Sequence, residues 1–245
     1  MKRIELIGVE GLPEVRPGDD LAALICARAT FRAGDVMVVA QKVVSKSEGR
    51  LVDIDSVKAS AEAVEIAGRL IANPDPRIVQ VVLDESVRVL RSDRVLITET
   101  RHGYVAANAG VDHSNVPGEN MLALLPVDPD ASAVRLRERI RELSGHEVGV
   151  IVSDTFGRPW RLGIVNVALG VAGLPAVLDL RGTVDDAGKS LHATVLALAD
   201  EIAAAAGVVM GKTARAPVVI VRGVDLPGDG TGRDLIRPEA EDLFR

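Results

Sequence analysis

The chain has 245 residues, of which 47% are hydrophobic and 26% are charged, a balance typical of a folded globular protein. Its net charge of −6 argues against a nucleic-acid-binding protein, which would present a basic face. No apolar run reaches the ~18 residues that span a membrane, and the first residues, MKRIEL, lack the apolar core of a signal peptide. The lone Cys26 leaves no partner for a disulfide, so we expect a protein of the reducing cytoplasm.

Short apolar runs alternate with helical patterns along the chain. In chain order we predict a strand at 4–9; a helix at 21–31, capped by Asp19 or Asp20 and ended by Gly34; a strand at 36–40; a loop at 42–49; a helix at 57–71; strands at 78–83 and 94–98; a helix at 131–143, capped by Asp130; strands at 148–152 and 176–180; a helix at 191–206; and a strand at 217–221. This mixed order favours an α/β or α+β fold with mixed sheets, and we predict the α+β class.

The most informative segment runs from residue 152 to residue 170, directly after the apolar run 148–152. An apolar strand that delivers Asp154 and Thr155 to a Gly-rich turn suits metal and phosphate chemistry, because both need oxygens and backbone amides at a strand's end. The same segment holds Arg158, Arg161 and the only tryptophan, Trp160. The alternative is a buried strand followed by a loop capped by arginine.

A second polar segment, residues 109–115, places Asp112, His113, Ser114 and Asn115 in a row. This oxygen-rich set suits Mg²⁺ or Mn²⁺ rather than Zn²⁺, although on its own an Asx-type turn is the commoner explanation. Two carboxylates from separate loops are the minimum for a divalent cation that also carries substrate phosphates. We therefore predict Asp112, Asp154 and Thr155 as metal ligands.

Four segments, in this order, resemble coenzyme F420-0:L-glutamate ligases: GLPEVRPGDD at 11–20, KVVSKSEG at 42–49, AGVDHSN at 109–115 and SDTFGRPWR at 153–161. The resemblance extends from Gly8 to the tail at 237–244. It implies a ligase that adds L-glutamate through γ-glutamyl amide bonds to the deazaflavin-type precursor F420-0, using GTP and Mg²⁺ or Mn²⁺, with K⁺ as a further candidate ion. It also implies a homodimer and two interleaved subdomains, 1–85 plus 208–245 and 86–207.

The nucleotide site has no familiar fingerprint in this sequence. Gly211-Lys212-Thr213 imitates the end of a phosphate-binding P-loop, but Ala206 stands where the first glycine belongs, and no dinucleotide-binding glycine motif occurs. From the residues alone, Lys42 and Lys46 are the most credible phosphate contacts, because lysines after a buried strand can hold triphosphate oxygens as mobile charges; a solvated lysine pair is the alternative. The resemblance implies nucleotide contacts at Leu12, Pro13, Glu14, Val15, Gln41, Lys42, Lys46, Asn115, Met210, Gly211, Lys212 and Thr213.

The chemistry that these groups suggest is phosphoryl transfer from GTP to the acceptor carboxylate, which gives an acyl phosphate that the amine of glutamate attacks. Asp112 and Asp154 would hold metal against the phosphates, and Arg158 and Arg161 suit the precursor's phosphate or the carboxylates of glutamate. These four residues form the predicted catalytic set. Trp160 suits either stacking on a flat ring or packing.

One position departs from the family pattern, because Lys212 stands where some relatives have a metal-binding glutamine. An ammonium group cannot ligate a cation. Either the charge of Lys212 replaces a second ion, or the metal shell is smaller in this chain.

Two rival functions stay open. A metal-dependent phosphohydrolase needs only Asp112, Asp154 and Thr155, and it would release phosphate from GTP without any acceptor. A non-catalytic nucleotide-binding module would use the same loops only to bind. The ligase is favoured because Arg158, Trp160 and Arg161 supply a second site for anionic ligands, which neither rival requires.

Overall fold

A five-stranded mixed sheet forms the centre of the computed structural model, which describes residues 3–114, 116, 118–211, 215–224 and 226–242. In spatial order the strands are β1 (Glu5–Gly8), β12 (Val218–Arg222), β2 (Val36–Ala40), β8 (Gly149–Arg158) and β9 (Arg161–Ala172). Strands β2 and β8 run parallel, and the other neighbouring pairs in this sheet are antiparallel. The strands predicted at 4–9, 36–40 and 217–221 are confirmed as β1, β2 and β12.

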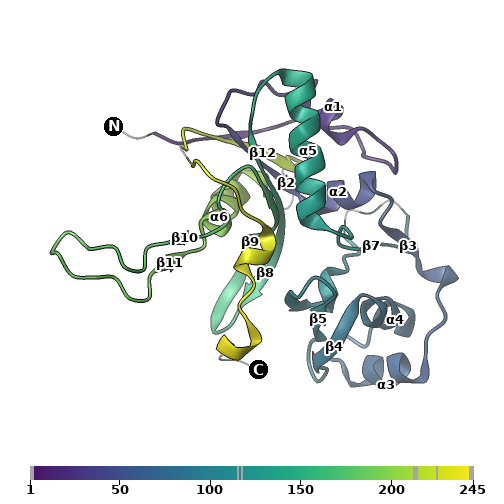
Figure 1. The fold of residues 1–245 in the computed structure, drawn as a ribbon. Helices are drawn as coiled ribbons and strands as arrows, with labels where there is room; N and C mark the ends of the chain where they lie inside the picture. Colours follow the sequence, from purple (N-terminus) through teal and green to yellow (C-terminus); the bar gives the residue numbers. More distant parts are fainter. Residues whose placement is uncertain (1–2, 115, 117, 212–214, 225, 243–245) are drawn as a thin grey trace.

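Helices cover both faces of this sheet (Figure 1). On one face, α1 (Leu21–Cys26) and α5 (Pro129–Ser144) pack against Met37 and Val39 of β2. On the other face, α6 (Leu198–Met210) packs against Val36 and Val38 of the same strand. Because both faces are buried, β2 is an unbroken apolar run rather than an alternating one.

Residues 51–125, which we call the small lobe, lie beside the main sheet (Figure 1). The lobe consists of β3 (Leu51–Asp53), η1 (Ile54–Ser56), α3 (Ala61–Arg69), α4 (Pro76–Asp84), β4 (Ser86–Arg91), β5 (Ile97–Thr100), β6 (Val105–Ala107), η2 (Asn108–Gly110) and β7 (Met121–Ala123). Two apolar clusters of its own hold it together. The predicted boundaries, 1–85 plus 208–245 and 86–207, do not coincide with this grouping, and the division into two subdomains stays a prediction.

The remaining elements complete an α+β fold, as predicted. Helix α2 (Gln41–Ser47) follows β2, and the tail contains η3 (Gly232–Leu235) and η4 (Glu239–Glu241). The short strands β10 (Leu178–Asp179) and β11 (Val195–Leu196) pair at the base of an arm that extends away from the main sheet (Figure 1). Within the described residues, no helix combines the length and apolar character needed to cross a membrane.

Two predicted elements have the wrong type. The predicted loop at 42–49 is largely helix α2, because Gln41, Val44 and Ser45 recur at helical spacing and bury one face. The predicted strand at 78–83 is part of helix α4, in which Asp75 caps the first turn and Pro76 occupies the first helical position. These two start signals outweigh the strand preference of the valine-rich run that follows.

Several predicted boundaries are also wrong. The helix predicted at 21–31 begins after its Asp20 cap but ends at Cys26, and the Arg28 guanidinium donates to the carbonyl of Leu24 in its last turn. The cap of α5 is Asp128 rather than Asp130, because proline takes the first helical position. The helices predicted at 57–71 and 191–206 begin at Ala61 and Leu198, and the strands predicted at 94–98, 148–152 and 176–180 are Ile97–Thr100, Gly149–Arg158 and Leu178–Asp179.

Candidate functional site

The parallel strands β2 and β8 bring two predicted site segments together at their carboxyl ends. Ala40, the last residue of β2, lies opposite Ser153 of β8. Helix α2 starts directly after Ala40, and Asp154 follows directly after Ser153. The start of α2 therefore lies next to Asp154. The carboxyl ends of parallel strands are also where α/β sheets commonly bind ligands.

Asp154 and Thr155 lie inside strand β8 and not at its end, which corrects the predicted position at a Gly-rich turn. They pair with Val167 and Asn166 of β9, so the strand continues as a hairpin. Its length is decided by pairing with β9, which the residues of β8 alone do not encode. Both side chains are partly buried.

Arg158 and Arg161 are brought together, but at the tip of the β8–β9 hairpin rather than beside Asp154. They pair with each other across the turn, in which Trp160 has a positive φ of 57°. Arg158 is four positions along the strand from Asp154, a span of about 13 Å at the usual rise per residue. Within one copy of the chain, the two arginines therefore stand apart from Asp154.

Asp112 lies in a tight turn at the edge of the small lobe. Its backbone exchanges hydrogen bonds of 3.0 and 2.8 Å with Ala123, and its carboxylate Oδ1 accepts from the Ser114 N–H at 2.7 Å. Asn108 and Ala109, just upstream, adopt left-handed φ values of 53° and 52°, a strained conformation often found near functional sites. The local structure is thus an Asx-type turn, which the sequence offered as the alternative to a metal-ligand set.

Lys42 connects this turn to the main sheet. Its Nζ lies 2.6 Å from Asp112 Oδ2, and it donates to the carbonyl oxygen of Ser114 at 2.7 Å and to Ser114 Oγ at 3.0 Å. The two segments are 72 residues apart in the chain. The structure therefore brings together Lys42 and Asp112, one predicted nucleotide contact and one predicted metal ligand.

The charge on Lys42 also affects the acidity of its partner. Burial by itself would raise the pKa of the Asp112 carboxyl, but hydrogen bonds from Lys42 and from the Ser114 backbone outweigh burial and hold the pKa below its ordinary value. The carboxylate is therefore ionised throughout the neutral range, with Lys42 as its counter-ion.

We expect this pKa shift to appear as a pH dependence of stability. Because the folded-state pKa of Asp112 is lowered, its stabilising contribution is complete above the ordinary value of 3.8 and is lost as the pH falls through the lower folded value. Urea unfolding from about pH 6 to pH 3 should show a steeper acid loss of stability in the wild type than in Asp112→Asn. Parallel curves for the two proteins would contradict the assignment.

Eight of the other eleven predicted nucleotide contacts lie within the described residues. Lys46 of α2 is buried and bonded to Glu14 Oε1, so two of them meet directly. Gln41 is buried, and its Oε1 accepts from Ser45 Oγ at 2.8 Å. Leu12 packs against the main core and Val15 is buried within it, while Pro13 lies in the same exposed loop. Met210 is the last residue of α6 and Gly211 caps the helix, whereas Asn115, Lys212 and Thr213 lie outside the described residues.

Asn166 lies in the segment 152–170 but is not among the predicted site residues. It lies opposite Thr155 on β9, and its Nδ2 contacts Ser153 Oγ at 3.2 Å and Met210 Sδ at 3.4 Å. A Cβ on Gly207 would come within 2.9 Å of Asn166, so the glycine allows α6 to approach this side chain. Asn166 thereby links Ser153 of β8 to the end of α6.

The donor chemistry near Lys42 fits a hard cation. One carboxylate oxygen, one carbonyl and one hydroxyl surround the ammonium group, and these are ligand types that Mg²⁺ and Mn²⁺ prefer. In the part of the chain that the structure describes, no three His, Cys, Asp or Glu side chains cluster as a metal site. A bound metal would therefore depend on few protein carboxylates and on oxygens from its substrates.

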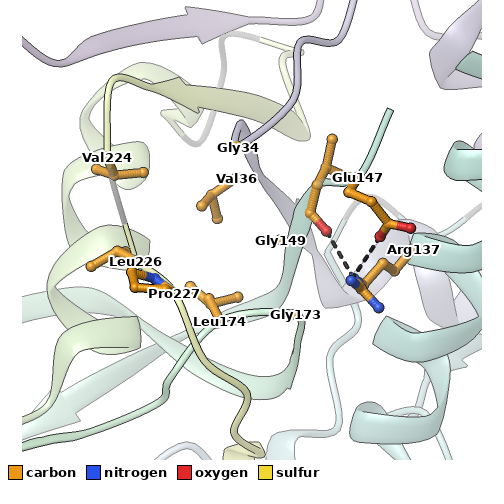
Figure 2. Close-up of a pocket in the computed structure, with 11 residues that line it drawn as sticks. Gly34, Val36, Arg137, Glu147, Gly149, Gly173, Leu174, Val224, Leu226 and Pro227 are labelled. Carbon is orange, nitrogen blue, oxygen red and sulfur yellow. Dashed lines mark hydrogen bonds and ion pairs between the residues drawn. The ribbon is translucent and has the colours of Figure 1, made fainter. Parts of the chain in front are cut away.

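Two cavities lie away from these residues. The first, of about 220 Å³, is at the amino ends of β2 and β8, the opposite end of the strands from Lys42 (Figure 2). Arg137 on its wall donates to Glu147 at 2.7 Å and to the Val148 carbonyl at 3.0 Å. The second, of about 340 Å³, lies between the 101–104 turn and the start of α5. Neither of these two is lined by a predicted site residue.

Comparison with known proteins gives a consistent result over nearly the whole chain. A sequence model described as F420-0:Gamma-glutamyl ligase matches residues 11–223. A coenzyme F420:L-glutamate ligase from Methanocaldococcus jannaschii is 45% identical over 249 residues, covering 100% of this chain and 98% of that protein. Proteins of the same name from Methanothermobacter thermautotrophicus and Archaeoglobus fulgidus are 44% and 46% identical, with at least 97% of each chain covered.

Proposed function

The chain belongs to the F420-0:gamma-glutamyl ligase family, and from this premise we propose that it joins L-glutamate to F420-0 through a γ-glutamyl amide bond, at the expense of GTP. The observation that carries the proposal is the contact of Asp112 with Lys42, which lies on the helix that follows β2, the strand paired with the Asp154 strand, in a chain that is similar over its full length to named ligases. A cytoplasmic location and a role for K⁺ stay predictions.

The reaction needs an activated carboxyl group, because oxide is too poor a leaving group for direct attack by an amine. We propose that the terminal phosphoryl group of GTP passes to the acceptor carboxylate, giving GDP and an acyl phosphate. The amine of glutamate then attacks the acyl carbon, phosphate leaves, and the amide forms with loss of a proton from nitrogen. Such phosphoryl transfer depends mainly on positioning and on charge stabilisation.

The residues near α2 have distinct parts in this scheme. Lys42 and Lys46 supply positive charge for the triphosphate oxygens. Asp112, Asp154 and Thr155 would hold Mg²⁺ or Mn²⁺, which would neutralise charge on the phosphates. Arg158 and Arg161 would bind carboxylate or phosphate groups as guanidinium forks. The position of these arginines at the hairpin tip leads to the next proposal.

We propose that the chain acts as a homodimer in which the β8–β9 hairpin tip is covered by the second copy. Trp160, Leu162 and Ile164 are 84%, 100% and 56% exposed, an apolar group too prominent for a tip that stays in water. A second copy could also bring arginines of one tip near the Asp154 of the other. Light scattering should give twice the chain mass for the wild type, and Leu162→Asp should shift it toward the monomer; a monomeric wild type would contradict the proposal.

The function is tested by incubating the purified chain with F420-0, L-glutamate, GTP and Mn²⁺, followed by mass spectrometry of the cofactor product. We expect F420-0 to gain whole glutamate residues, and each of the four components to be required. Steady GTP hydrolysis that is indifferent to both acceptors would instead favour the hydrolase. GTP binding without turnover in the complete mixture would favour the binding module.

A further inference from the structure

The ammonium group of Lys42 lies where a cation would approach Asp112. It is held by three oxygens at 2.6–3.0 Å, which come from the Asp112 carboxylate and from the carbonyl and hydroxyl of Ser114. The other carboxylate oxygen of Asp112 already accepts the Ser114 N–H. Lys42 is thus the internal counter-ion of a predicted metal ligand.

Lys42 and a divalent cation cannot both occupy this position. Mg²⁺ on a carboxylate oxygen sits about 2.0–2.1 Å away, while Lys42 Nζ is 2.6 Å from Asp112 Oδ2. Two positive centres would then lie a few ångströms apart. The side chains of Lys42 and Asp112 are only 17% and 32% exposed, so water screens this repulsion incompletely. The ammonium must therefore leave Asp112 before a metal can bind there.

A triphosphate offers Lys42 an alternative partner. Its long side chain can turn from the Asp112–Ser114 turn toward other oxygens without moving helix α2. The other lysine of the helix, Lys46, is already buried against Glu14 on a different loop. Of these two lysines, Lys42 is the one whose present partner is a predicted metal ligand.

We propose that Lys42 acts as an interlock between nucleotide and metal binding. In the nucleotide-free protein it neutralises Asp112 and keeps divalent cations off the site. When a nucleoside triphosphate arrives, its oxygens take the ammonium group and open Asp112 to the cation. This inference rests on the proposed GTP- and metal-dependent function, and it makes the two bindings cooperative, since each favours the same arrangement of Lys42.

The test measures Mn²⁺ binding by the electron paramagnetic resonance signal of free Mn²⁺, without acceptor or turnover, and subtracts the Mn²⁺ that the same concentration of analogue binds in the absence of protein. Wild-type protein should bind Mn²⁺ at least about 10-fold more tightly with a saturating non-hydrolysable GTP analogue than without it. Lys42→Met, which keeps length but removes charge, should bind at least about 10-fold more tightly than wild type when no nucleotide is present. Lys42→Arg, which keeps the charge, should stay close to wild type.

Two controls separate the interlock from a general charge effect. Lys58→Met removes an exposed lysine of the small lobe, lowers the net charge by the same amount and should leave Mn²⁺ binding unchanged. Adding Asp112→Asn to Lys42→Met should abolish the gain. Equal affinities of wild type and Lys42→Met, an equal gain in Lys58→Met, or a gain that survives Asp112→Asn would each overturn the interlock. Any of these three results would leave the proposed ligase function standing, because the ligase assay tests it separately. If none of the proteins bound Mn²⁺, even with the analogue, the metal-dependent function would be overturned as well.

Discussion

Replacing Asp154 by asparagine should lower ligase activity by about 100-fold or more, the usual cost of losing a central electrostatic group in an active site. The substitution keeps the size of the side chain and removes the charge that would face the metal and the phosphates. Asp154 lies within strand β8, beside the start of α2. Because it is predicted to hold the metal, we expect a lower turnover number and a changed dependence of the rate on metal concentration. The measurement is the steady-state rate across a Mn²⁺ titration, with circular dichroism to verify the fold.

Two further variants sharpen this prediction. Asp112→Asn should have a similar effect, and the double variant should lose less than the product of the two single losses, because both groups would serve one site. Asp186→Asn, on the exposed β10–β11 arm, is the matched control and should keep full activity. Near-normal turnover of Asp154→Asn at limiting metal would assign Asp154 a structural role.

The largest loss of stability is expected from Asp35→Ala, at the opposite end of β2 from the candidate site. The Asp35 carboxylate is 1% exposed and accepts from Arg222 Nε at 2.8 Å, from Arg222 Nη2 at 2.7 Å and from the Arg32 N–H at 2.8 Å. Removing it leaves Arg222, whose side chain is 17% exposed, without its carboxylate partner, and breaking a buried pair typically costs about 3–5 kcal/mol. For a chain of this size, the melting temperature should fall by roughly 6–20 °C.

An exposed ion pair provides the comparison. Glu65 and Arg69 pair at 2.8 Å on α3, with side chains 71% and 52% exposed, so Glu65→Ala should change stability by less than about 0.5 kcal/mol. Calorimetry of both variants beside the wild type makes the measurement. Similar melting temperatures for Asp35→Ala and Glu65→Ala would show that the Arg222 pair contributes little. Activity of Asp35→Ala well below its melting point should match the wild type, because this pair lies far from Lys42.

The family and the main apolar strands could be predicted from the sequence by itself. Runs such as residues 36–40 and 217–221 are β-branched, short and bounded by turn residues, and those features act locally on the backbone. The same local reasoning marked Asp112, Lys42 and Asp154 as reactive groups, because their chemistry is a property of each side chain. The motif match also pointed to the family that the comparisons identify.

The lengths of the strands and the geometry of the candidate site could be seen only in the tertiary structure. The valine-rich run at 78–83 suits either a strand or a buried helix face; the local start signals Asp75 and Pro76 favour helix α4, and packing within the small lobe buries its Val79 and Val82. The pairing of β8 with β9 decides that Asp154 lies inside a strand and that Arg158 lies at an exposed tip. Lys42 and Asp112 meet because the small lobe packs beside the main sheet. Local periodicity specifies which face of an element is buried, but contacts between residues 72 apart depend on how the elements pack together, which no local pattern encodes.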